Sequence, residues 1–207
     1  MTHVIAGLYV IIDPDACRGR SPVEVARFAL EGGARIIQWR DKHRDKGDQL
    51  ADALAIAAIC RERDAIFIIN DHADLAITTG ADGVHLGQHD LPIEAVRPIV
   101  GAAMIIGVST NNAAEAQRAE AAGANYVAIG AIFATASKQV TRQASLDRLA
   151  EVKAAVRVPV VAIGGINASN IASVVAAGAD AAAVISAVCT ADDVQAAALT
   201  LSSAFTA

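Results

Sequence analysis

Short apolar runs rich in β-branched residues recur along the chain, and an alanine-rich segment with helical character follows each of them. Their spacing of roughly 20 to 30 residues is close to the repeat of an alternating β/α chain. The nearly continuous apolar character of the runs is typical of strands buried on both faces. The runs cover residues 8–12, 35–39, 65–69, 83–86, 104–108, 126–129, 158–163 and 181–185.

The segments between the runs favour helices. Residues 48–63 carry apolar side chains at helical spacing, and residues 112–122 and 169–177 each end before a glycine that can terminate a helix. Eight β/α units predict an α/β protein, specifically a single-domain (β/α)8 TIM barrel over residues 1–207. An open doubly wound sheet is the main alternative, but no GxGxxG motif follows the first strand. In a barrel, functional residues should lie just after the strands.

The composition indicates which kinds of partner this protein is suited to bind. The chain has 207 residues, of which 54% are hydrophobic and 19% charged, and this composition favours one globular domain. A net charge of −5 without a basic run argues against a nucleic-acid partner. No apolar run suits a membrane span, and the N-terminus lacks a secretory signal. Cys17, Cys60 and Cys189 lie far apart in the sequence, which favours free thiols in the cytoplasm. The sequence allows a homo-oligomer but does not decide the oligomeric state.

The end of the second run carries a candidate anion site. Gln38, Arg40 and Lys42 alternate, so an extended strand points all three to one face and Trp39 to the other, toward covering helices. An arginine fork and a lysine ammonium together suit a phosphate or diphosphate. The alternative is a solvated strand end without function.

Two carboxylates follow the third and fourth runs. Asp71 and Asp90 would lie on adjacent strands next to these cations, which suits Mg²⁺ because that ion takes oxygen ligands and keeps waters. Both residues could instead be helix N-caps, or serve both roles. His85 and His89 lie in a strand and turn, where they lack the helical spacing of a zinc pair, so we expect no zinc site. Asp13 and Asp15, after the first run, are interpreted as part of a polar loop.

A second anion site is predicted after the last two strands. Gly164, Gly165 and Ser186 occupy the positions where barrels commonly form a phosphate cup from backbone N–H groups. Lys138 follows the sixth strand and adds a cation to Arg40 and Lys42. Two phosphorylated molecules could therefore meet in one barrel mouth, and transfer of a group with loss of pyrophosphate is a natural reaction there.

These motifs together resemble the thiamine-phosphate synthase family over nearly the whole chain. The resemblance rests on Gln38–Lys42, Ile69–Asp71, Asp82–Gln88, Ile106–Ser109 and Val161–Ile166. It implies a transferase that condenses 4-amino-2-methyl-5-hydroxymethylpyrimidine diphosphate with 4-methyl-5-(2-phosphoethyl)thiazole, giving thiamine phosphate and pyrophosphate by a dissociative substitution.

The resemblance also implies roles for single residues. Pyrimidine diphosphate would contact Gln38, Arg40, Lys42, Asn70, Ser109 and Lys138, of which Arg40, Lys42, Ser109 and Lys138 would be catalytic. Thiazole phosphate would contact Thr135, Ser137, Gly165, Ile185 and Ser186, and Mg²⁺ would be the cofactor at Asp71 and Asp90. Residues 137–145 are interpreted as a lid over the mouth.

Three alternatives remain open at this point. A thiazole tautomerase relative would share the barrel and the phosphate cup, but it should not need the five residues of the diphosphate and metal site. A sugar-phosphate epimerase would need an acid/base pair or a histidine-held metal. A non-catalytic barrel that binds thiamine precursors would bind its ligand without turnover.

Overall fold

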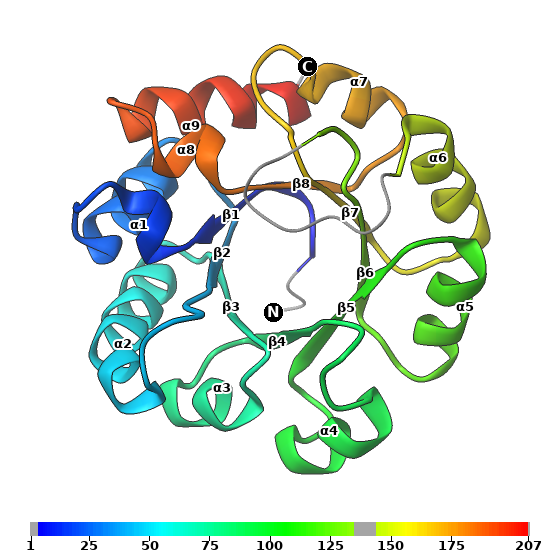
Figure 1. The fold of residues 1–207 in the computed structure, drawn as a ribbon, viewed down its shortest axis with the longest axis horizontal. Coiled ribbons are helices and arrows are strands. Elements are labelled where there is room, and N and C mark those ends of the chain that lie inside the picture. The colour runs from blue at the N-terminus through cyan, green and yellow to red at the C-terminus, as the bar shows by residue number, and fades with distance from the viewer. Residues whose placement is uncertain (1–3, 135–143, 207) are drawn as a thin grey trace.

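The computed structural model describes residues 4–134 and 144–206, and they form a closed barrel of eight parallel strands surrounded by helices (Figure 1). All eight predicted strands are present, so the prediction of a (β/α)8 barrel is confirmed. The strands are β1 Gly7–Ile12, β2 Ile36–Trp39, β3 Ile66–Asn70, β4 Gly83–Leu86, β5 Ile105–Thr110, β6 Tyr126–Ile129, β7 Val160–Ile163 and β8 Ala181–Val184.

Helices cover the outside of the barrel, as Figure 1 shows. The three helices predicted by residue range correspond to α2, α5 and α7, with ends that differ by one or two residues. The helical elements are η1 Pro14–Cys17, α1 Pro22–Glu31, α2 Lys46–Glu62, α3 Ala73–Thr79, α4 Ile93–Val100, α5 Ala113–Ala121, α6 Leu146–Ala155, α7 Ile171–Ala176, α8 Ser186–Cys189, α9 Val194–Ser202 and η2 Ser203–Phe205.

The barrel closes because β1 pairs with both β2 and β8. Tyr9 lies opposite Ile36 on one side and opposite Ala183 on the other. Every neighbouring pair of strands is parallel, so all carboxyl ends of the strands reach the same rim. This geometry places the residues after each strand around one opening.

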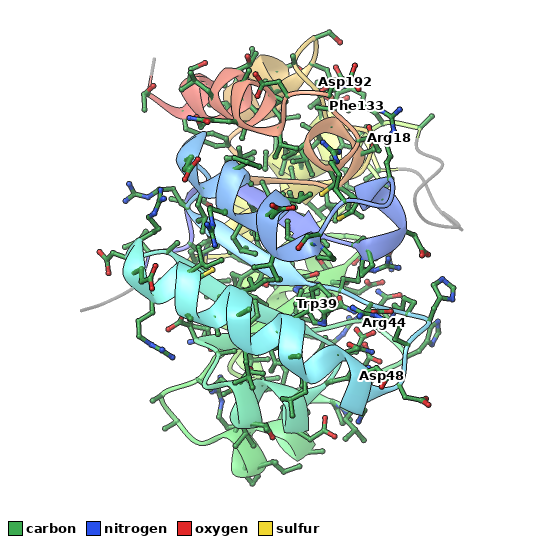
Figure 2. The ribbon with its side chains drawn as sticks, turned by 90° about the vertical axis from the view of Figure 1, so that its left-hand side faces the viewer. Arg18, Trp39, Arg44, Asp48, Phe133 and Asp192 are labelled. Atoms are coloured by element: carbon green, nitrogen blue, oxygen red, sulfur yellow. The ribbon has the colours of Figure 1, made fainter. Side chains whose placement is uncertain are left out.

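Alternation along the strands creates two apolar layers. Tyr9, Ile68 and Tyr126 belong to the layer inside the barrel, whereas Trp39 belongs to the larger layer between the strands and the helices. The indole Nε1 of Trp39 donates to Gln49 Oε1 of α2 over 3.1 Å, beside the cyan helix in Figure 2. Trp39 therefore points toward the helices, as its position in the sequence predicts.

In the described parts of the chain, no helix is long and apolar enough to cross a membrane. The three cysteines are free thiols, and all three are buried.

Candidate active site

A cavity of about 830 Å³ opens at the carboxyl ends of the strands. Its walls include the predicted site residues Gln38, Arg40, Lys42, Asn70, Asp71, Asp90, Ser109, Gly165, Ile185 and Ser186. The predicted residues Thr135, Ser137 and Lys138, and most of the predicted lid, lie outside the described residues. Ten positions spread from residue 38 to residue 186 thus meet in one cavity, because parallel strands bring their ends to the same rim.

The basic end of β2 is held by carboxylates from its two neighbouring strands. Arg40 forms an ion pair with Asp13, which follows β1, and its backbone N–H donates to Ile12 O over 3.0 Å. Lys42 forms an ion pair with Asp71, which follows β3. Both cations therefore have fixed positions before any ligand arrives, and a phosphate would meet them already oriented.

Asp41 organises the turn between these two cations. Its carboxylate accepts from the backbone N–H groups of His43 and Arg44 and from Arg44 Nε over 3.0, 3.1 and 2.5 Å. Burial raises the pKa of Asp41, but these donors outweigh burial and hold that pKa below its ordinary value. The Arg44 guanidinium also lies 5.4 Å from the ring centre of Trp39, in a cation–π contact that ties the turn to the outer layer (Figure 2).

Asp71 and Asp90 lie together at the rim. Asp71 adopts a left-handed φ of +63°, and its N–H donates to His85 O over 2.8 Å, so β4 fixes its backbone. Asp90 Oδ2 accepts from Gly87 N over 2.6 Å. The N-caps of α3 and α4 are His72 and Pro92, so the alternative that Asp71 and Asp90 cap these helices is wrong.

The electrostatics of this pair suit a cation. Burial and the neighbouring Asp71 carboxylate raise the pKa of Asp90. Two carboxylates that oppose each other's charge fit a divalent metal, which would relieve the repulsion. No group of three or more His, Cys, Asp or Glu side chains suited to a metal is found within residues 4–134 and 144–206. A metal held by two carboxylates leaves positions for water and substrate oxygens, the arrangement that Mg²⁺ prefers.

A chain of polar side chains crosses the barrel interior beneath the cavity. Gln38 Nε2 donates to the Tyr9 hydroxyl over 2.6 Å, and that hydroxyl lies 3.0 Å from the hydroxyl of Tyr126. The Tyr126 hydroxyl lies 2.9 Å from His85 Nδ1, and His85 Nε2 lies 2.9 Å from Ser109 Oγ. Five side chains from β1, β2, β4, β5 and β6 therefore form one continuous hydrogen-bonded series.

After β7, backbone atoms of a glycine loop form part of the cavity wall. Gly164 and Gly165, after β7, adopt left-handed φ values of +99° and +65°. A Cβ atom at Gly165 would lie 2.6 Å from Ala134 O, so only glycine fits there. Asn170 Nδ2 donates to Gly165 O over 2.9 Å and holds the loop, while Ser186 begins α8 after the neighbouring strand β8.

Residues 8–188 match the family described as thiamine monophosphate synthase. The chain belongs to this family. It is 50% identical over 195 residues to a thiamine-phosphate synthase of Methanoculleus marisnigri, covering 94% of this chain and 92% of that one. A thiamine-phosphate synthase of Methanoregula boonei is 50% identical over 192 residues, covering 92% and 89%. A solved thiamine phosphate pyrophosphorylase from Pyrococcus furiosus has a TM-score of 0.89 at 39% identity, covering 97% and 96%.

The prediction that the chain is a thiamine-phosphate synthase, and hence a transferase, is confirmed by these likenesses. The roles assigned to single residues stay predictions.

Sequence reasoning missed Asp13, the partner of Arg40, and three residues that line the thiamine monophosphate synthase cavity, namely Tyr9, His85 and Tyr126. Asp13 was interpreted as part of a polar loop, yet it pairs with Arg40 while its Oδ1 accepts from Asp15 N over 3.1 Å. Tyr9, His85 and Tyr126 form the interior series, but they lie within strands rather than after them. Gly107 lies opposite Tyr126 on β5 and leaves room for its aromatic ring, but this pairing depends on the strand register, which the sequence does not display.

Proposed function

We propose that this family member joins the pyrimidine diphosphate to the thiazole phosphate and releases pyrophosphate. The observation that carries the proposal is the meeting of two different anion sites in one cavity. One site consists of Arg40, Lys42 and the Asp71–Asp90 pair. The other is the glycine loop at Gly165 with the start of α8.

The first site suits a diphosphate with a metal. Asp71 and Asp90 would hold Mg²⁺, which when bound would neutralise diphosphate charge and make pyrophosphate a better leaving group. Arg40 and Lys42 would bind the diphosphate oxygens beside it, with Lys138 as a further cation. To do so, Lys42 would exchange part of its contact with Asp71 for the ligand.

The reaction needs charge stabilisation rather than a covalent enzyme intermediate. As the bond between the pyrimidine methylene carbon and the diphosphate oxygen breaks, negative charge gathers on the departing group, where fixed cations are most effective. Gln38, Asn70 and Ser109 would hold the pyrimidine. The thiazole nitrogen then supplies the electron pair for the new carbon–nitrogen bond.

The second site suits the thiazole phosphate. Gly165, Ile185 and Ser186 present backbone and a hydroxyl at the opposite wall, and Thr135 and Ser137 would complete the cradle.

We further propose that residues 1–207 act as one catalytic domain on small molecules in the cytoplasm. The buried, free state of all three thiols supports a reducing compartment.

A reconstituted assay tests the activity. Purified protein receives both substrates and Mg²⁺, while pyrophosphate release and thiamine phosphate mass are followed together. We expect both products in equal amounts, and we expect both to disappear with EDTA or with Asp71→Ala.

Asp74→Ala is the matched control, because Asp74 is an exposed carboxylate on α3 that pairs with Lys46. It should keep full activity. Thiazole phosphate binding without product would favour the tautomerase-like or the non-catalytic reading. Activity that survives both EDTA and Asp71→Ala would refute the metal role.

A further inference from the structure

Donor and acceptor chemistry sets the direction of the interior hydrogen-bonded series. The amide nitrogen of Gln38 can only donate, so the Tyr9 oxygen accepts from it. The hydroxyls of Tyr9 and Tyr126 lie 3.0 Å apart, and the distance alone fits either as the donor. Because Tyr9 already accepts from Gln38, we assign the hydrogen between the two hydroxyls to Tyr9.

The direction continues to the far wall of the barrel. With that assignment, the Tyr126 hydroxyl accepts from Tyr9 and has its own hydrogen left to donate to Nδ1 of His85, 2.9 Å away. An imidazole that accepts at Nδ1 carries its hydrogen on Nε2 and donates it to Ser109 Oγ, at 2.9 Å.

We propose that Tyr9, Tyr126 and His85 are positioning residues that hold His85 as the neutral Nε2–H tautomer and thereby direct the Ser109 hydroxyl hydrogen into the cavity. At the other end, the same series uses one N–H of Gln38 and leaves its carbonyl oxygen for a ligand. Ser109 thus becomes a hydrogen-bond donor to the substrate, and Gln38 becomes an acceptor. We call the hydrogen-bonded series of Gln38, Tyr9, Tyr126, His85 and Ser109 the relay. Its effect on the substrate rests on the proposed reaction, whereas the direction of its hydrogen bonds does not.

Burial supports a fixed relay. Tyr9 and Tyr126 are 1% and 0% exposed, and burial raises the pKa of both phenols, so they stay protonated hydroxyl groups. The ring of His85 stacks on that of Tyr126 with centroids 5.6 Å apart, which restricts rotation of the imidazole. All five members of the series lie on barrel strands, and groups held on strands keep their positions more precisely than groups on loops.

Nuclear magnetic resonance of ligand-free protein measures the direction without any substrate. Two-bond proton–nitrogen correlations distinguish the tautomers, and the His85→Gln variant identifies which signals belong to His85. Well above the ordinary histidine pKa of about 6.5, we expect the hydrogen on Nε2 and none on Nδ1. A hydrogen on Nδ1 would overturn the relay.

Two amide variants test the effect on catalysis. The amide nitrogen of His85→Gln reaches the place of Nε2 and can still donate to Ser109, whereas that of His85→Asn reaches only the place of Nδ1. We expect His85→Gln to keep kcat within about tenfold of the original protein, and His85→Asn to lose a further tenfold to hundredfold. In a Ser109→Ala background this difference should vanish. Equal losses, or a difference that survives Ser109→Ala, would contradict the relay.

Removal of a single hydroxyl provides the second comparison. Tyr126→Phe keeps the ring but breaks the series, and we expect mixed His85 tautomers and a kcat about tenfold lower. Thr79→Val also removes a buried hydroxyl, which donates to Leu75 O on α3 over 2.8 Å, but it should leave kcat and the tautomer unchanged. Thermal unfolding of each variant separates loss of fold from loss of positioning.

An unchanged tautomer in Tyr126→Phe would refute the role of the phenol. If the unmodified protein formed no thiamine phosphate, the proposed reaction would be refuted. The resonance measurement would still test the direction of the relay, because it needs no substrate.

Discussion

Arg40 at the end of β2 forms an ion pair with Asp13 at the end of β1, and the two side chains are only 18% and 13% exposed. An arginine with so little solvent exposure needs an anionic partner, because an unpaired charge that is largely buried destabilises the folded protein. The pair also fixes the guanidinium at the cavity wall before a ligand arrives.

Asp13→Asn should therefore both destabilise the protein and weaken substrate binding. The amide keeps an oxygen for Asp15 N but removes the charge opposite Arg40. We expect the free energy of unfolding, measured in urea, to fall by about 1–3 kcal/mol, and KM for the pyrimidine diphosphate to rise about tenfold. Asp192→Asn, which breaks the exposed pair with Arg18, should change neither quantity. Tighter diphosphate binding by Asp13→Asn would mean that Asp13 competes with the ligand instead.

Gly165→Ala should selectively impair the thiazole phosphate. The new Cβ would meet Ala134 O at 2.6 Å, so the loop that forms the cup must move. Gly80→Ala is the matched control, because Gly80 has the same φ of +65° but faces only the end of Arg61, at 3.8 Å. Both variants should lose about 1 kcal/mol of stability from the left-handed backbone. Only Gly165→Ala should raise KM for thiazole phosphate, and a matching rise for both substrates would contradict a separate cup.

Gly107→Ala should disrupt the barrel interior at a single point. A Cβ there would lie 2.0 Å from Cζ of Tyr126, so the ring must shift away from its partners. We expect about 1–3 kcal/mol of destabilisation in thermal or urea unfolding, together with loss of kcat. Gly47→Ala, on α2 with nothing within 4 Å of its new Cβ, should be neutral or slightly stabilising. A Gly107→Ala variant with unchanged kcat would show that the position of Tyr126 does not matter.

Asp41→Asn should alter the dependence of stability on pH. The folded-state pKa of Asp41 lies below its unfolded value, so ionised Asp41 stabilises the protein above about pH 4 and loses this effect as the pH falls through the folded pKa. At pH 7 we expect the variant to be about 1–2 kcal/mol less stable, because Arg44 loses one of its two anionic partners and keeps only Asp52. Urea titrations at several pH values should show the gap closing in acid. A gap that is constant with pH would exclude the carboxylate charge as its cause.

Much of the fold could be predicted from the sequence because apolar runs at β/α spacing determine where strands lie. The shared face of Gln38, Arg40 and Lys42 followed from simple alternation, and all three line the cavity. Pairings between strands could not be predicted in this way. The partners of Arg40 and Lys42 depend on which strand ends become neighbours.

The interior series was missed for a different reason. His85 and Tyr126 lie inside runs whose apolar neighbours suggest only packing. Whether a buried tyrosine meets a histidine depends on the register between β4, β5 and β6, which a single sequence does not display.

Closure between β8 and β1 has a consequence for protein synthesis. Tyr9, Gln38 and His85 emerge with the first four strands, whereas Ser109 and Tyr126 emerge later. A nascent chain that stops before β8 still has an open edge on β1 and lacks the wall at α8. The residues that line the cavity come from both halves of the barrel, so the complete cavity exists only after the barrel closes.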